Sequence, residues 1–438
     1  MKKPTIVLSS AVLAASAFAA QVDRVLVRQM WPWSSEVRVE YTVSGTTAPA
    51  AVSFAFFDGA TPLAPTDLTA LQGDTAYAGN GMHVVTFDPK ALFGLTDTQQ
   101  FADFKVQVTL GEESEIMGDK LYKIIDLDTG KVTDVTRADF YNNKGYGTYE
   151  TDFSVFGSGG WNTSLQNVLV WTGVTNNPIY KTSKIVMRYI TAKDQTFTMG
   201  GSWHATGQPA HSVTLTNDYY LSVFEVTQAQ LYKLTGSYGS PYGNAEDKSV
   251  PAFGRWDTVW GRPNTWPNGR HNVTMTSGNF LGELRSLVGG SILFDLPTEA
   301  QWEFACRAGT DTQYYTGLSS TTDKAKLGYL IDKGNSGAQY PAAAGSFLPN
   351  AFGLYDMYSN AHEWCLDWFE DYSEDAQTDP VGPSATSTNS DYNKKRVTRG
   401  AHFNGVSATK TGATVYRSAV QPTANSSLAG CRLWCPAD

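Results

Sequence analysis

Residues 350–369, NAFGLYDMYSNAHEWCLDWF, carry the side chains of this chain that are best suited to chemistry. Aromatic side chains, which favour burial, are interleaved here with acidic residues, and His362 stands directly beside Glu363. A buried carboxylate needs a hydrogen-bond donor or a cation as its partner. The stretch therefore predicts either a bound ion or a tight polar network inside an aromatic core.

The same stretch offers oxygen ligands for a hard cation. Asp356 and Glu363 place two anionic groups within eight residues. Ca²⁺ is bound by sets of carboxylate and carbonyl oxygens of this kind. The spacing is not that of an EF-hand loop, so a second interpretation stands beside the first. In it, the two carboxylates cap turns or pair with arginines such as Arg399 or Arg432.

Thiols are the other reactive groups in the chain. The four cysteines all lie in its second half: Cys306, Cys365, Cys431 and Cys435. An even number of cysteines in an exported protein permits two disulfides, with three possible connectivities between which the sequence does not choose. Four cysteines are too few to build a scaffold of 438 residues, so a hydrophobic core must stabilise the fold.

The first residues, MKKPTIVLSSAVLAASAFAA, have the features of a secretory signal: two lysines, a short apolar run and a small-x-small cleavage site. We expect cleavage after Ala19, and therefore an exported protein, periplasmic or extracellular. No later stretch is apolar and long enough for a transmembrane helix. The formal net charge is -9 and no basic block occurs, which argues against nucleic acid or an anionic membrane as partner.

Composition changes along the chain predict further segments after the signal at 1–19. Residues 20–110 alternate apolar and polar side chains between turn residues, which predicts an antiparallel β-sandwich of immunoglobulin-like size. Residues 111–183 are expected to hold a β-hairpin at 121–136, around Asp128-Thr129-Gly130, followed by a linker.

The remaining residues, 184–438, mix strands, short helices and long loops. KIVMRYI and PAHSVTLTNDYYLSVFEVT are expected strands. Thr227 is the expected cap of a helix that ends at Gly236, and residues 279–288 place apolar side chains on one helical face. Thr298 and Gln301 form a capping box for the helix EAQWEFACRA.

Six segments of this part occur in an order that is similar to the formylglycine-generating enzyme, or sulfatase-modifying factor, family. They are FTMGG, HSVTLTNDYYLSVFEVTQAQ, LPTEAQWEFACRAGT, PNAFGLYDMYSNAHEW, RVTRGAHF and GCRLW. The resemblance covers residues 184–438 and implies a compact, loop-rich mixture of α and β structure related to C-type lectins. The expected fold class of the whole chain is α+β, with the β-sandwich preceding this domain.

The resemblance also implies an activity that this chain departs from. Formylglycine-generating members oxidise a cysteine of a sulfatase with oxygen and with copper(I) held by two cysteines that follow an RGGSW-like motif. Here the motif reads RGAHF, and the two cysteine positions are occupied by Gly405 and Lys410. Neither side chain binds copper(I), which selects thiolates. Copper is therefore not expected. Cys431 and Cys435 lie further downstream with a different spacing, and we interpret them as a disulfide or as two buried thiols.

Two histidines stand where the family has other residues. His362 lies in the WEW-like motif and His402 at the serine position of the RGGSW-like motif. Imidazole binds copper, zinc or iron, so the pair raises the alternative of a metal-dependent oxidoreductase with altered chemistry. The competing interpretation is that each is a hydrogen-bonded loop histidine.

The resemblance implies a calcium loop in the opening stretch, with ligands at Asp356, Ser359, Ala361 and Glu363. Structural roles are expected for the other prominent side chains: core packing for Trp302, Phe304, Trp364 and Trp368, loop tethering for Arg417 and Arg432, and helix-dipole compensation for Glu299. The leading hypothesis is an exported, calcium-stabilised binding or scaffold module that lacks cysteine oxidation. Its expected partner is a protein or a carbohydrate.

Overall fold

A computed structural model of the chain places most residues of both expected domains. It describes residues 20–29, 34–96, 101–114, 118–142, 171–239, 248–262, 271, 275, 277–315, 341–358, 360–383, 394–403, 414–424 and 428–437. The signal at 1–19, together with Ser359, Gly405 and Lys410, lies outside these residues. Over the described residues the chain is a mixed α/β structure with mainly antiparallel sheets.

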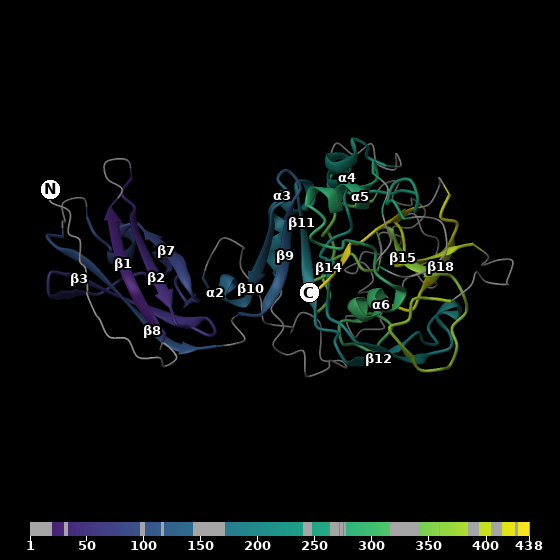
Figure 1. Ribbon diagram of the computed structural model, residues 1–438, viewed down its shortest axis with the longest axis horizontal. Coiled ribbons are helices and arrows are strands. Elements are labelled where there is room, and N and C mark those ends of the chain that lie inside the picture. The colour runs from purple at the N-terminus through teal and green to yellow at the C-terminus, as the bar shows by residue number, and fades with distance from the viewer. Residues whose placement is uncertain are drawn as a thin grey trace. The chain divides into compact units, whose positions relative to one another are not determined.

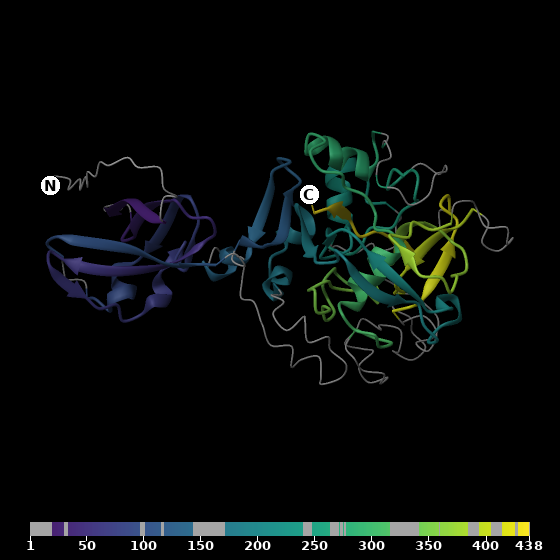
Figure 2. The same cartoon turned by 60° about the horizontal axis from the view of Figure 1, so that its bottom comes forward.

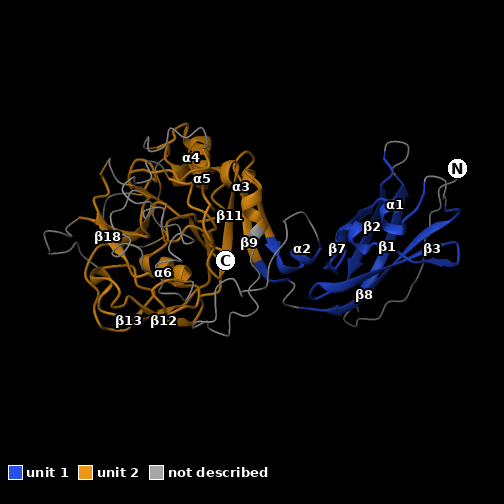
Figure 3. Cartoon of the chain, turned by 180° about the vertical axis from the view of Figure 1, so that it is seen from behind, with its two compact units in different colours: residues 1–120, 135–148 blue, residues 121–134, 149–438 orange. Residues whose placement is uncertain are grey.

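The chain divides into two compact units, coloured separately in Figure 3. Unit 1 comprises residues 1–120 and 135–148, and unit 2 comprises residues 121–134 and 149–438. The division differs from the expected segments 20–110, 111–183 and 184–438, because the expected middle segment is shared between the two units. Residues 121–134, which hold the turn of the expected hairpin, belong to unit 2.

Unit 1 is an antiparallel β-sandwich, as the alternating pattern predicted. One sheet has the order β1-β2-β7-β5, and the other has the order β4-β3-β6 with β8 paired to β3. The strands are β1 (Gln21–Gln29), β2 (Val37–Ser44), β3 (Ala50–Asp58), β4 (Thr61–Leu63), β5 (Gln72–Gly73), β6 (Tyr77–Ala78), β7 (Gly81–Phe87) and β8 (Phe104–Glu113). Phe56 of one sheet and Phe87 of the other meet edge to face in a shared core, 5.7 Å between ring centroids. A specific immunoglobulin-like relationship stays a prediction.

Short helices complete unit 1. They are η1 (Leu68–Ala70), α1 (Pro89–Phe93) and α2 (Arg137–Tyr141). Asp88 caps α1 by accepting a hydrogen bond from the backbone N–H of Lys90, and Gly94 ends the helix in a left-handed conformation.

Unit 2 is built on a five-stranded sheet of order β10-β9-β11-β14-β20, visible at the centre of Figure 1. Its strands are β9 (Lys120–Asp126), β10 (Val132–Thr136), β11 (Lys184–Ile190), β14 (Tyr219–Ser222) and β20 (Trp434–Pro436). In Figure 2 the last strand, in yellow, lies beside the teal strands of this sheet. Strands from both ends of unit 2 therefore share one core.

The turn of the β9–β10 hairpin packs against a helix that is distant in sequence. Gly130 has φ +71, and a Cβ there would lie 2.3 Å from the carbonyl oxygen of Leu287. Only glycine allows both the left-handed backbone and this approach. The predicted hairpin is confirmed, and it extends the sheet of unit 2.

Two further sheets of unit 2 carry the residues that the sequence singled out. One has the order β12-β13-β16 and the other the order β18-β17-β15-β19. Their strands are β12 (Gln195–Met199), β13 (His211–Leu215), β15 (His362–Trp368), β16 (Gln377–Thr378), β17 (Arg396–Arg399), β18 (Arg417–Val420) and β19 (Ala429–Gly430). All seven residues of β15 are buried.

Two helices of unit 2, α4 (Gln228–Thr235) and α6 (Glu299–Arg307), begin where the capping residues predicted. The unit also contains η5 (Thr172–Asn176), α3 (Ile179–Thr182), η6 (Ala205–Gly207) and α5 (Phe280–Leu287). Thr227 with Gln230 and Thr298 with Gln301 form complete capping boxes, and Asn279 caps α5. Trp302, Trp364 and Trp368 are buried and Phe304 is partly buried, as expected of core residues. No helix among the described residues is long and apolar enough to cross a bilayer.

Candidate functional site

The two histidines singled out by the sequence meet at one end of the β18-β17-β15-β19 sheet. β17 pairs with both β15 and β18, in registers that place Glu363 opposite Arg399 and Arg399 opposite Arg417. His362, His402 and Tyr416 adjoin these paired positions. The His362 ring centroid lies 4.7 Å from that of His402 and 6.1 Å from that of Tyr416.

Hydrogen bonding fixes the proton of His362. Its Nδ1 lies 3.0 Å from the carbonyl oxygen of Gly400, which can only accept, so Nδ1 carries the hydrogen. Burial, with His402 nearby, lowers the pKa of His362 to about 3, and burial also lowers the pKa of His402. Both rings are therefore neutral at pH 7, and Nε2 of His362 carries a lone pair.

Neutral imidazoles in this arrangement resemble metal ligands in one respect. Metal-bound histidines usually donate their other ring N–H to a carbonyl or a carboxylate. Nδ1 of His402 is buried and has no hydrogen-bond partner among the described residues. Within the described part of the chain, however, no group of three His, Cys, Asp or Glu side chains is placed to hold a metal ion. The pair alone is an incomplete metal site.

The described cysteines do not fit a copper(I) site. All four are buried free thiols, so of the alternatives for Cys431 and Cys435 the structure has two thiols and no disulfide. Burial raises the pKa of Cys435 to about 12 and raises the pKa of Cys431 well above its ordinary value. Copper(I) binds thiolates, and these thiols remain protonated in the core.

The described part of the expected calcium loop already has hydrogen-bond donors. Both Glu363 oxygens accept from the Arg432 guanidinium, and Oε2 also accepts from the Trp302 indole N–H at 2.6 Å. The Asp356 oxygens accept from the backbone N–H groups of Gly345 and Phe347. A guanidinium at Glu363 repels a second cation, so these carboxylates do not fit a Ca²⁺ ion in this arrangement. The calcium assignment stays a prediction, because Ser359 lies outside the described residues.

A third carboxylate, which the sequence reasoning missed, joins this cluster. Glu225 is buried and accepts hydrogen bonds from the Ala361 backbone N–H and the Asn360 amide, both at 2.9 Å. Burial, with Asp356 and Glu363 nearby, raises the pKa of Glu225 well above its ordinary value. Its sequence context, FEVT, gives no signal beyond an acid inside an apolar strand-like run.

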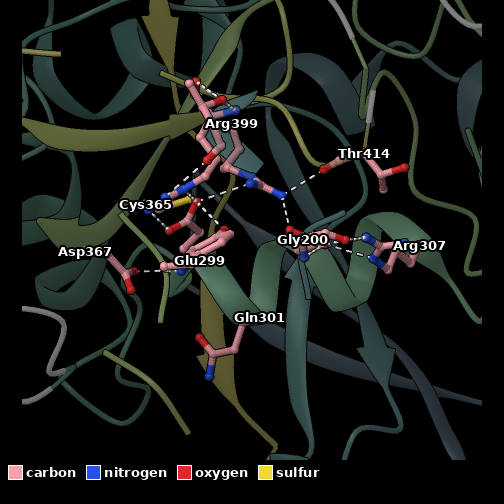
Figure 4. Close-up of polar contacts among 12 residues, drawn as sticks. Gly200, Glu299, Gln301, Arg307, Cys365, Asp367, Arg399 and Thr414 are labelled. Carbon is pink, nitrogen blue, oxygen red and sulfur yellow. Dashed lines mark hydrogen bonds and ion pairs between the residues drawn. The ribbon is translucent and has the colours of Figure 1, made fainter. Parts of the chain in front are cut away.

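A buried ion-pair network supports the histidine end of the sheet (Figure 4). Arg399 points toward helix α6, donating to Glu299 at 3.1 Å and to Glu303, and it also donates to the Thr414 carbonyl at 2.7 Å. Arg417 donates to both oxygens of Glu299, at 2.6 and 2.8 Å. Arg417 and Arg432 therefore tether separate segments, as expected. Glu299 exceeds its expected role of dipole compensation, because it anchors two strands to α6.

Asp367, at the edge of this network, makes stability depend on pH. Its Oδ2 accepts from the Glu299 backbone N–H at 2.6 Å, and burial together with the charge of Glu299 raises the pKa of Asp367 to about 7. The unfolded value is about 3.9, so the folded state binds this proton more tightly. The stabilisation is complete below about pH 4 and is lost as the pH rises through about 7.

Asp367→Asn is therefore expected to flatten the fall in unfolding free energy between pH 5 and pH 8. The expected difference from wild type over this range is on the order of 2–4 kcal/mol. Urea titrations at the two pH values measure it, with the exposed Asp371→Asn as matched control. An unchanged pH slope in Asp367→Asn would show that another group is responsible.

Comparison with known proteins finds relatives of the part of the chain that holds this site. The family described as "Sulfatase-modifying factor enzyme 1-like domain" matches residues 181–435. A formylglycine-generating enzyme of Thermomonospora curvata is 34% identical over 121 residues, which are 25% of this chain and 38% of that protein. The mouse formylglycine-generating enzyme is 26% identical over 232 residues, 44% of this chain and 59% of that protein.

The match therefore spans about two-fifths to three-fifths of these relatives. Among solved structures, Treponema denticola variable protein 1 has a TM-score of 0.45 at 21% identity, covering 58% of this chain and 95% of that one.

Proposed function

Because this chain belongs to the sulfatase-modifying factor enzyme 1-like family through residues 181–435, we propose that it is an exported member that binds a partner and does not oxidise cysteine. The supporting observation is the chemistry at the copper positions. Gly405 and Lys410 stand where the family resemblance places thiolates, and every cysteine of the chain is a buried free thiol. Such a domain keeps the family's framework and lacks its metal ligands.

The direct test is turnover of a cysteine-containing sulfatase peptide. We expect no conversion of cysteine to aldehyde by the purified, copper-supplemented protein, measured by mass spectrometry against a formylglycine-generating enzyme as positive control. Aldehyde product would overturn the proposal. Loss of that product in Cys431→Ser/Cys435→Ser would then assign the oxidation to those two thiols.

A second candidate, a metal-dependent oxidoreductase of altered chemistry, is favoured by the geometry of His362 and His402. Their neutral rings, 4.7 Å apart between centroids, and the His402 Nδ1, which has no hydrogen-bond partner among the described residues, would supply two of the ligands of a metal ion. A bound ion there would act as a Lewis acid or redox centre. The protein's own part would be to hold His362 in the Nδ1–H tautomer through Gly400.

Metal analysis of protein produced with copper, iron and calcium separates these candidates. We expect no stoichiometric copper or iron. Bound calcium, with a lower melting temperature in chelator, would support the calcium prediction, because a ligand of the native state stabilises it. Copper or iron that is absent from His362→Ala would instead establish the oxidoreductase candidate. An unchanged melting temperature in chelator would contradict the calcium prediction.

Export is also part of the proposal. It rests on the lysines, apolar run and cleavage site of residues 1–19. Amino-terminal sequencing of the protein from an export-competent host is expected to begin at Ala20. A mature chain that begins at Met1 would contradict it.

A further inference from the structure

A cavity lies beside the C-terminal strand β20. It is separate from the histidine cluster, which is formed by His362 and His402. Its volume is about 460 Å³, within the range of small-molecule sites. It is lined by residues from the ends of β11, β13 and β20, by the first turn of α6 and by the segment after β16. All of the lining residues belong to unit 2. They share helix α6 with the ion-pair network, but their side chains take no part in that network.

Two aromatic groups of the lining have unsatisfied nitrogens. Trp434 is 6% exposed, and its indole N–H has no hydrogen-bond partner among the described residues. His271 stacks on Trp434, 3.5 Å between ring centroids, and neither of its ring nitrogens has a hydrogen-bond partner there. Nδ1 of His271 lies 3.8 Å from Asp295, beyond hydrogen-bond distance. Because an unsatisfied buried polar group is costly, an occupant with hydrogen-bonding atoms would be favoured beside these nitrogens.

Planar polar side chains surround the same space. Gln301 lines the cavity and, in Figure 4, points away from the ion-pair network. Its Oε1 accepts from the Thr298 backbone N–H in the capping box, which leaves its amide N–H groups for an occupant. Asn217 adds a second amide, whose nitrogen also donates to the Thr216 hydroxyl. Asp218 and Asp379 add two carboxylates that already accept hydrogen bonds. Asp218 accepts from Tyr189 and two backbone N–H groups, and Asp379 accepts from Thr216.

The charges of the lining decide which ligand chemistry fits. Two carboxylates face one lysine, Lys193, so an anion is disfavoured. A cation would suit the carboxylates but offers no acceptor to the Trp434 indole N–H. Hydroxyl groups both donate and accept, so a neutral polyol can accept from the Trp434 indole and the Gln301 amide while donating to lone pairs that remain on the carboxylates.

We propose that this cavity binds a small neutral polyhydroxylated ligand of the size of a sugar. The inference deepens the proposed binding function and depends on it. Trp434 and His271 supply an aromatic wall for the apolar face of such a ligand, while Gln301 and Asn217 supply amide groups for its hydroxyls. The histidine cluster plays no part in this binding.

The test is calorimetric titration of the full mature protein with glucose, galactose, mannose and N-acetylglucosamine. We expect saturable binding of at least one sugar with a dissociation constant of about 1 mM or lower. Val381→Trp, which fills the cavity, is expected to abolish it. Gln301→Glu keeps the cap acceptor but removes the amide donor, and is expected to weaken binding about tenfold.

Lys105→Ala, in unit 1, is the matched control and is expected to bind as wild type. Circular dichroism and melting temperature verify that each variant is folded. Absence of binding to all four sugars, or binding that survives in folded Val381→Trp, would overturn the inference. Aldehyde formation in the peptide assay would instead overturn the proposed non-oxidising function, so the two failures are distinguishable.

Discussion

Arg432→Met is expected to lower the free energy of unfolding by about 3–5 kcal/mol. Arg432 is fully buried and donates to Glu363 and to the carbonyl oxygens of Ser222, Val223 and Tyr355. Its removal leaves the Glu363 carboxylate buried without a counter-charge. The buried carboxyl groups of Asp356 and Glu225, whose pKa values burial raises, lie near the same position.

Urea or guanidinium unfolding of unit 2, with a tryptophan fluorescence readout, measures the effect. The matched control is Arg28→Met, which breaks an exposed 3.5 Å pair with Glu40 in unit 1 and is expected to cost less than about 1 kcal/mol. The double variant Arg432→Met/Glu363→Leu is expected to recover part of the loss, because an apolar pair avoids an isolated charge. A loss below about 1 kcal/mol in Arg432→Met would refute the proposed role of this pair.

Arg399→Met is the second large effect, again expected at about 3–5 kcal/mol. This guanidinium is fully buried, bridges Glu299 and Glu303 of α6, and donates to the Thr414 carbonyl. Without Arg399, Glu303 still accepts hydrogen bonds from the Arg307 guanidinium, the other arginine that contacts it among the described residues. β17 would then be held less firmly against α6.

A structural readout separates this effect from a general loss of stability. Because β17 leads directly to Gly400 and His402, we expect the proton resonances of His362 and His402 to shift in Arg399→Met under conditions where it is folded. Arg38→Met, at a partly exposed 2.9 Å pair with Glu40, is the matched control and should leave both resonances unchanged. Unchanged histidine resonances in folded Arg399→Met would mean that the network does not position the cluster.

These two networks explain why four of the six segments of the resemblance belong together. LPTEAQWEFACRAGT supplies Glu299 and Glu303, and RVTRGAHF supplies Arg399, which pairs with them. PNAFGLYDMYSNAHEW supplies Glu363, and GCRLW supplies Arg432. Charged side chains that lie up to more than a hundred residues apart in the sequence are therefore ion-pair partners in the fold. Because burying any one of these charges alone is costly, the segments that carry them pack against one another.

The sequence by itself determined the local elements of this protein. Capping boxes at Thr227 and Thr298 specified the starts of α4 and α6, since these hydrogen bonds join residues three apart. Alternating side chains specified the strands of unit 1, and the hairpin at 121–136 followed from its turn residues. The prediction that Gly405 and Lys410 stand at the copper positions comes from the resemblance and also required no coordinates.

Tertiary structure alone decided which distant groups became partners. Asp356 and Glu363, taken together in the sequence as calcium ligands, separate into a backbone-bonded carboxylate and an arginine pair. Glu225 joins them from a segment more than a hundred residues away, and the four cysteines remain free thiols. The register of β15, β17 and β18 brings His362 beside His402. Such pairings depend on strand register and burial over long sequence separations, for which local patterns of polarity carry no signal.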